Sequence, residues 1–242
     1  MKRRDVFGMI GALGTGLSLS SSPLAAQEHG AHSAGPTPNS PLSHPHAHFC
    51  GIHVAKNDPK FQIIVQHYCA AHSGETEEDQ LFQCVLFDST EANAKLLGIE
   101  YIISDQQFRK LPEAEQKYWH PHTYEVLGGG LIAPAMKPDD ELAFMKKLLT
   151  TWGKTWHTWP DPTTPIPVGE PLLIWALTAD GQPDPRIVAE RDAKFHVSVD
   201  AIREQRGQAI GYEVPNVSAP TSIDQIGRQW TDNGPDVPKP RK

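Results

Sequence analysis

The stretch QIIVQHYCA, residues 62–70, decides the fold that the sequence predicts. Its residues are mainly apolar or β-branched, which is typical of a β-strand. Side chains alternate between the two faces of a strand, so His67 and Cys69 share one face with two apolar residues. LFQCVLFD, residues 81–88, predicts a second strand. The segment between them is polar and contains glycine, so the two strands are expected to form a hairpin.

Strand and helix patterns alternate through the rest of the central region. Acidic residues early and lysines late make residues 137–153 the clearest helix, with Gly153 at its end. The mixture predicts an α+β single domain at residues 48–211, in which helices flank a mostly antiparallel sheet. We expect further strands at 50–55, 95–104, 123–135, 154–159 and 170–178, and further helices starting at Ser104-Asp105, at 112–119 and within 184–206.

Both ends of the chain are predicted to lie outside this domain. Residues 1–26 combine basic residues with an apolar stretch and a small-residue end, which is typical of a cleavable signal peptide. Arg3 and Arg4 favour the twin-arginine type, with a general secretory signal as the alternative. Residues 27–47 predict a flexible linker rich in histidine and proline, and residues 212–242 a proline-rich disordered tail. We therefore expect an exported protein, periplasmic or secreted.

The charge of the chain excludes some partners. The sequence has 22 basic and 29 acidic residues, so its formal net charge at pH 7 is −7. A chain with this charge and no basic cluster is a poor partner for nucleic acid or anionic lipid. Beyond the signal peptide, no apolar run approaches the length of a membrane span, so we expect no transmembrane segment in the mature chain.

Three cysteines raise a question about redox state. Cys69 and Cys84 are close enough in sequence to bridge the predicted hairpin in an oxidising compartment. Thiolate ligation of a metal is the alternative for this pair. The count is odd, so one thiol is left over.

The stretch WHPHTYE, residues 119–125, holds two imidazoles and a carboxylate. An extended backbone would place His120 and His122 on one face, where both nitrogens can reach one metal ion. Zinc, copper and iron all accept imidazole. Glu125 would point to the other face unless the chain bends. A pair of surface or hydrogen-bonded histidines is the alternative.

Histidines elsewhere extend this candidate site. His157 lies between two tryptophans and His67 lies in an apolar strand, so each is either a core histidine or a ligand in a dry pocket. A catalytic metal site needs three protein ligands and an open position. We expect a zinc, copper or iron ion held by His120, His122 and His157 with His67 or Glu125. His53 and Glu100 lie in predicted strands and are further candidates, and His44, His46 and His48 are candidates for accessory metal capture.

Several motifs in order resemble one family, the oil body-associated proteins of plants and their bacterial and fungal relatives. They are HYCA (67–70), QCVLFDS (83–89), NAKLLGIEYIIS (93–104), LPEAEQKYWHPHTYEV (111–126), GKTWHTW (153–159) and PVGEPLLIWALTADGQPDPRIVAERDAKF (167–195). The resemblance covers about residues 48–206. It implies association with seed oil bodies for the plant members, and it supplies no catalytic residues. Because the plant members are intracellular, it also keeps reduced thiols open for Cys69 and Cys84.

Three functions remain open at this point. The first is a metal site built on the histidines of the domain, with no reaction assigned. The second is a non-enzymatic protein that binds lipid or the cell envelope, with Trp152, Trp156, Trp159 and Trp175 lining an apolar surface. The third is a periplasmic metal carrier that relies on the histidines of residues 29–48.

Overall fold

The computed structural model describes residues 47–72, 79, 81–178 and 180–210. The predicted signal peptide, the predicted tail and the predicted linker except Ala47 lie outside the described residues. His44 and His46 lie there too.

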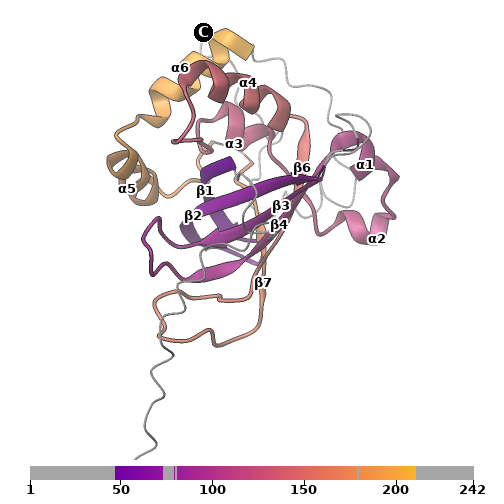
Figure 1. The fold of residues 1–242 in the computed structure, drawn as a ribbon. Coiled ribbons are helices and arrows are strands. Elements are labelled where there is room, and N and C mark those ends of the chain that lie inside the picture. The colour runs from indigo at the N-terminus through magenta and orange to yellow at the C-terminus, as the bar shows by residue number, and fades with distance from the viewer. Residues whose placement is uncertain (1–46, 73–78, 80, 179, 211–242) are drawn as a thin grey trace, which may run out of the picture. The chain divides into compact units, whose positions relative to one another are not determined.

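An antiparallel sheet that closes on itself forms the centre of the described region (Figure 1). The strand order is β4-β3-β2-β1-β7-β6-β5, and β4 also pairs with β6, so six strands form a ring. The expectation of an α+β protein with a mostly antiparallel sheet is confirmed, but a sheet that is simply flanked by helices is wrong. The strands are β1 (Ala47–Ala55), β2 (Asp58–His72), β3 (Leu81–Phe87), β4 (Leu96–Ser104), β5 (His120–Pro121), β6 (Thr151–His157) and β7 (Leu172–Trp175).

The predicted hairpin is present as the pair β2–β3. Its register places Cys69 opposite Cys84, and the neighbouring pairs continue this row to Glu100 on β4 and Thr155 on β6. Paired residues of adjacent strands point to the same face of a sheet. A closed sheet turns one of its faces inward, so this row brings polar groups into the interior.

The described residues also form six helices, which pack outside the ring and over one end of it. In Figure 1, α3, α4 and α6 gather over one end of the strands, and α1 and α2 lie together at the side. Ser104 begins α1 as expected, because its side chain accepts a hydrogen bond from the backbone N–H of Gln107 in a capping box. The helices are α1 (Asp105–Lys110), α2 (Glu113–Gln116), α3 (Thr123–Leu127), α4 (Pro138–Leu148), α5 (Pro185–Phe195) and α6 (Val199–Ile210).

One predicted element is wrong, and another is present but shorter than predicted. Residues 123–135 were expected as a strand, but the backbone N–H of Val126 donates to the carbonyl of His122, and Thr123–Leu127 forms α3. The predicted helix 137–153 ends early, at Leu148. Gly153 does not end a helix but lies within β6, where tertiary pairing with β4 and β5 overrides the local helical pattern.

Apolar side chains cover the outer face of the ring. Trp152 stacks on Phe108 of α1 with ring centroids 3.7 Å apart, and both are fully buried. Trp175 is 1% exposed. The lipid-binding hypothesis expects these tryptophans to line an apolar surface. Trp152 and Trp175 instead belong to the buried core.

Candidate metal centre

Glu100 is the central residue of a polar cluster inside the ring. It lies in the middle of β4, is 3% exposed, and accepts a hydrogen bond of 2.8 Å from the Thr155 hydroxyl of the neighbouring strand. Because the sheet is closed, side chains from strands far apart in the sequence reach the same carboxylate.

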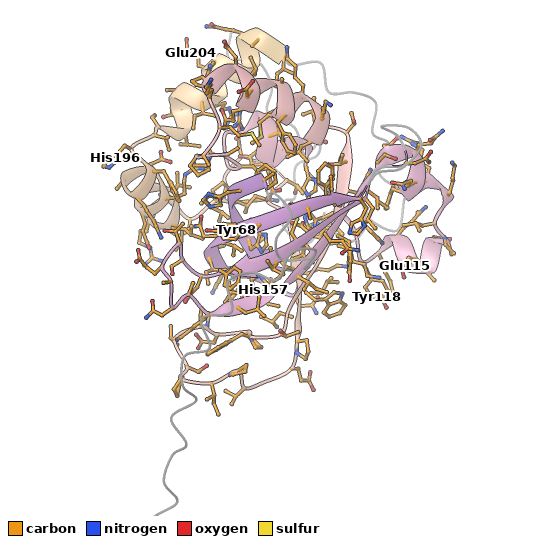
Figure 2. The ribbon with its side chains drawn as sticks, in the orientation of Figure 1. Tyr68, Glu115, Tyr118, His157, His196 and Glu204 are labelled. Atoms are coloured by element: carbon orange, nitrogen blue, oxygen red, sulfur yellow. A yellow bond between two sulfur atoms is a disulfide. The ribbon has the colours of Figure 1, made fainter. Side chains whose placement is uncertain are left out.

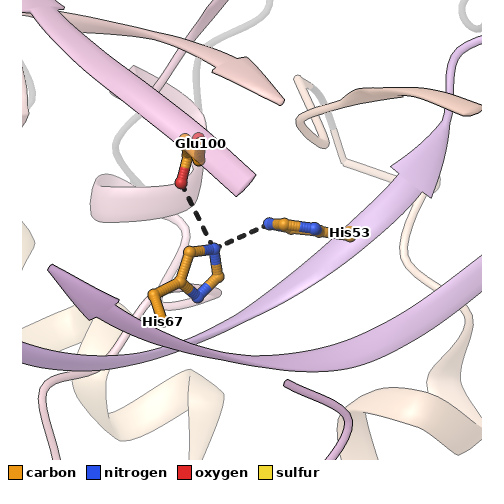
Figure 3. A group of neighbouring side chains, drawn as sticks. All are labelled: His53, His67 and Glu100. Atoms are coloured by element: carbon orange, nitrogen blue, oxygen red, sulfur yellow. Dashed lines mark hydrogen bonds and ion pairs between the residues drawn. The ribbon is translucent and has the colours of Figure 1, made fainter. Parts of the chain in front are cut away.

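Three imidazoles surround this carboxylate. His120 Nε2 and His122 Nε2 lie 3.4 and 3.6 Å from Glu100 Oε1. On the other side, His67 Nε2 lies 3.4 Å from Oε2 (Figure 3). The Glu100, His120 and His122 ligand atoms lie within 4.8 Å of one another, as do those of His53, His67 and Glu100.

The spacing of these atoms fits metal ligands better than hydrogen bonds. A hydrogen bond between nitrogen and oxygen spans about 2.7–3.2 Å. Two ligand atoms of a tetrahedral zinc site, each about 2.0–2.1 Å from the metal, lie about 3.3–3.4 Å apart. The contacts of Glu100 with His120 and His122, at 3.4 and 3.6 Å, are close to the second spacing.

Gly153 leaves open the space between these three ligand atoms. A Cβ atom built on Gly153 would lie 2.4 Å from Glu100 Oε1, 2.7 Å from His120 Nε2 and 2.8 Å from His122 Nε2. Side chains do not tolerate contacts this short, so only glycine fits while the three ligands keep their places. The same point is close to where an ion would lie with metal–ligand distances of about 2.0–2.2 Å.

The hydrogen bonds of Thr151 fix the orientation of one imidazole. The Thr151 hydroxyl donates to the carbonyl of Leu148 at 2.7 Å, so its oxygen accepts from His122 Nδ1, which lies 2.8 Å away. This hydrogen bond holds the His122 ring with its Nε2 directed at the Glu100 carboxylate, the nitrogen that a metal ion between the two residues would use.

A chain of three histidines continues behind His67. His53 Nε2 lies 2.8 Å from His67 Nε2, and His53 Nδ1 lies 3.0 Å from His157 Nε2. These are hydrogen-bond distances, so His53 orients its neighbours. Figure 3 shows the His53 ring directed at His67, and Figure 2 places His157 among the strands, whereas His196 lies at the end of α5.

Three buried nitrogens of this cluster are unsatisfied. Nδ1 of His67, His120 and His157 has no hydrogen-bond partner in the described part of the chain. Backbone carbonyls approach the His67 and His120 rings without reaching hydrogen-bonding geometry. A buried polar atom without a partner costs about 1–3 kcal/mol, so such atoms are rare in native proteins and mark functional sites when they gather.

Burial keeps most of these imidazoles neutral. It lowers the pKa of His157 to about 3, and it lowers the pKa of His67 and His120 below the ordinary value. The pKa of His53 falls well below that value because of burial and then because of His67 and His157. Neutral imidazoles have lone pairs available for a metal at neutral pH.

The two carboxyl groups of the cluster differ in charge. Burial alone would raise the pKa of Glu100, but the facing rings of His120 and His122 outweigh burial and hold this pKa well below its usual range. Glu100 is therefore ionised. Burial, followed by the charge of Glu100, raises the pKa of Glu125 well above its usual value. Glu125 therefore keeps its proton to a higher pH than an exposed glutamate, and it lines the same small cavity of about 10 Å³ as Glu100 and His122.

The structure brings together most of the residues expected at this site. His120 and His122 face one oxygen of Glu100, and His67 faces the other. His157 is not a neighbour of the carboxylate but contacts His53, and α3 turns Glu125 toward the cavity instead of away from it. Gly153, which leaves open the space between the Glu100, His120 and His122 side chains, is not among the predicted site residues, because its role depends on pairing between distant strands.

His48 and the cysteines have structural positions. His48, a candidate for accessory metal capture, lies in β1, contacts Gln66 Oε1 at 2.9 Å, and stacks on Tyr68. Ala47, expected at the end of the linker, is the first residue of β1. Cys69 and Cys84 form a disulfide, and Cys50 is a free, buried cysteine. Burial raises the pKa of the Cys50 thiol to about 11. The disulfide alternative therefore holds for this pair over metal ligation.

Comparison with known proteins gives a consistent result. The family described as "Protein of unknown function (DUF1264)" matches residues 39–210. Oil body-associated protein 1A of Zea mays is 37% identical over 174 residues, which is 72% of this chain and 71% of that protein. The chain belongs to the oil body-associated protein family. Oil body-associated protein 1B of Arabidopsis thaliana is 35% identical over 72% of this chain and 70% of its own length, and protein 2A of Zea mays is 32% identical over 76% and 71%.

No solved structure matches the chain. Within the part of the chain that the structure describes, no helix has the length and apolar character needed to cross a membrane. For this member of the oil body-associated family, the buried histidine and glutamate cluster is therefore the main guide to chemistry.

Proposed function

We propose that the protein binds one transition-metal ion through Glu100, His120 and His122. The observation that carries this proposal is the space over Gly153, which lies within 2.4–2.8 Å of one ligand atom from each of the three residues. Two imidazoles and one carboxylate suit zinc or ferrous iron. Copper is a further candidate because it also accepts imidazole.

The ligand set is that of a catalytic centre more than of a structural one. Structural zinc sites have four protein ligands, whereas catalytic sites have three and keep one position open. The small cavity beside Glu100 and His122 has about the volume of one water molecule, so it has room for a fourth, exchangeable ligand. Glu125 lines this cavity and can exchange a proton with a molecule bound there.

Metal analysis of glycine variants tests the proposal directly. The full chain, with His29→Ala, His32→Ala, His44→Ala and His46→Ala to remove competing ligands, is loaded separately with Zn²⁺, Fe²⁺ and Cu²⁺ and then dialysed. We expect about one ion per chain of at least one metal. Gly153→Ala places a methyl group in the space of the ion and should weaken binding at least about 100-fold.

Gly130→Ala is the matched control, because its added Cβ would meet nothing closer than 3.6 Å. It should bind metal like the parent. Glu100→Gln keeps the shape but removes the charge, and should also lose the ion. A parent protein that retains no metal, or a Gly153→Ala variant that binds as well as Gly130→Ala, would refute the proposal.

We also propose that the protein is exported, which the composition of residues 1–26 supports. Fractionation of the native host should recover a processed chain outside the cytoplasm. A full-length chain in the cytoplasmic fraction would exclude export.

The names of the relatives favour a role at lipid bodies as a second candidate. Flotation with lipid droplets tests that role, and a protein that stays in the aqueous fraction counts against it.

A further inference from the structure

A second, larger cavity lies next to the metal centre. Its volume is about 480 Å³, which is in the range of small-molecule binding sites. Residues of α3, α5 and α6 line it together with the segment after β7. Glu125 lines both this cavity and the small cavity beside Glu100. Glu125 is therefore a residue that the ligand-sized pocket shares with the small cavity beside the proposed metal position.

The charged groups in the wall of this pocket are already paired. Arg203 donates to both carboxylate oxygens of Asp180, at 2.6 and 2.9 Å, and Tyr124 donates to the same carboxylate at 2.9 Å. Arg191 donates to the carbonyls of Gly129 and Gly130 and to the carboxylate of Asp192. A charged ligand would have to displace one of these pairs, and an uncharged ligand would not.

The remaining wall is largely apolar. Ile52, Leu177 and Val188 line it, together with prolines and a valine. Glu125 differs from the other polar residues of the wall. The residue is 6% exposed, and no hydrogen bond engages its carboxyl group in the described part of the chain. A buried carboxyl group that lacks a partner and lines a cavity is available for a ligand in that cavity.

We propose that this pocket binds a small, uncharged, largely apolar molecule that carries a hydroxyl or carbonyl group, and that this group pairs with Glu125. The apolar wall provides the affinity, and the single polar contact fixes the inner end of the ligand. The binding step does not require the metal. The polar end of the ligand would lie at Glu125, the residue that the pocket shares with the small cavity beside Glu100.

Binding of 1-octanol and octanoate to the full chain, measured by ligand-observed NMR and competition, tests this inference. We expect 1-octanol to bind. Octanoate should bind at least about tenfold more weakly, because its carboxylate would be buried in the pocket without a cationic partner. Glu125→Leu should weaken 1-octanol binding by about 3–10-fold, the value of one hydrogen bond.

A matched pair of α5 variants locates the site. Ala189 lines the pocket and is exposed, so Ala189→Trp fills it without disturbing the core, whereas Ala193 is exposed and does not line it. Ala189→Trp should weaken 1-octanol binding at least about tenfold, and Ala193→Trp less than about twofold.

Gly153→Ala tests whether ligand binding is independent of the metal. This variant should bind 1-octanol like the parent. Loss of metal with retained 1-octanol binding separates the two proposals. Absence of 1-octanol binding, tighter binding of octanoate, or equal effects of the two tryptophan variants would overturn this inference.

Discussion

Two buried polar regions of this protein differ in how well their groups are satisfied. The guanidinium of Arg206 donates to the carbonyls of Val126 and Leu131 and to the Glu141 carboxylate, at 2.7–2.9 Å. Arg191 is fully buried and equally well paired. In the histidine and glutamate cluster, three buried nitrogens have no partner in the described residues. The groups that support the fold are fully bonded, whereas the cluster keeps unpaired Nδ1 atoms, which are not the Nε2 atoms that face Glu100.

Breaking the satisfied region should have the largest effect on stability. Arg206→Met leaves two carbonyls and the Glu141 carboxylate without their buried partner, so the free energy of unfolding should fall by about 3–5 kcal/mol. Urea denaturation measures the change. Arg186→Met is the control, because that side chain is 89% exposed and solvent screens its ion pair with Asp184, so we expect little change. Equal effects of the two variants would remove the distinction between the regions.

The unsatisfied region should respond to acid. The pKa of His157 is lowered to about 3 by burial, so the folded protein binds fewer protons than the unfolded chain below the ordinary histidine pKa. The stability that the neutral His157 ring contributes to the free energy of unfolding is fully present above about pH 6.5 and is lost as the pH falls toward 3. For the metal-free protein, the loss between about pH 7.5 and 5.0 should be about 2 kcal/mol from His157 alone.

His157→Asn should remove that part of the pH dependence, and His196→Asn, at an exposed histidine on the end of α5, should not. Urea denaturation in the presence of a chelator at both pH values gives the comparison. Unchanged pH dependence in His157→Asn would mean that this ring does not stay neutral in the folded protein.

Glu125 should show the opposite sign and a smaller effect. Its pKa is raised by burial and by Glu100, so the folded protein holds a proton that the unfolded chain releases above its ordinary carboxyl pKa. The contribution of the protonated Glu125 carboxyl to the free energy of unfolding is present at low pH and is lost as the pH rises. Glu125→Gln should therefore stabilise the protein at neutral pH by about 0.5–2 kcal/mol, because a buried glutamine is neutral without taking up a proton on folding.

Thermal denaturation with Glu113→Gln, at an exposed position of α2, as the control measures this change. A destabilised Glu125→Gln variant would show that Glu125 supports the fold. Glu125 would then belong with Arg191 and Arg206 and not with the histidine and glutamate cluster.

The helices and strands with strong local patterns were predictable, because their signals lie in neighbouring residues. The alternation of apolar residues in 62–70 and 81–88 predicts the β2–β3 hairpin, which brings Cys69 opposite Cys84. Ser104 predicts the start of α1. The prediction failed at 123–135, where contacts of α3 with other helices decide the conformation.

The sequence alone determined that the interior is rich in imidazole, because alternation places His67 and His157 on faces that strands bury. It also singled out His120 and His122 as a pair. Only the closed sheet decided that Glu100 is their common partner, since β4 and β6 meet across 55 residues between Glu100 and Thr155. Closure likewise placed Gly153 beneath the ligands. Local pattern reports which face a side chain takes, and strand pairing over long distances decides which side chains meet there.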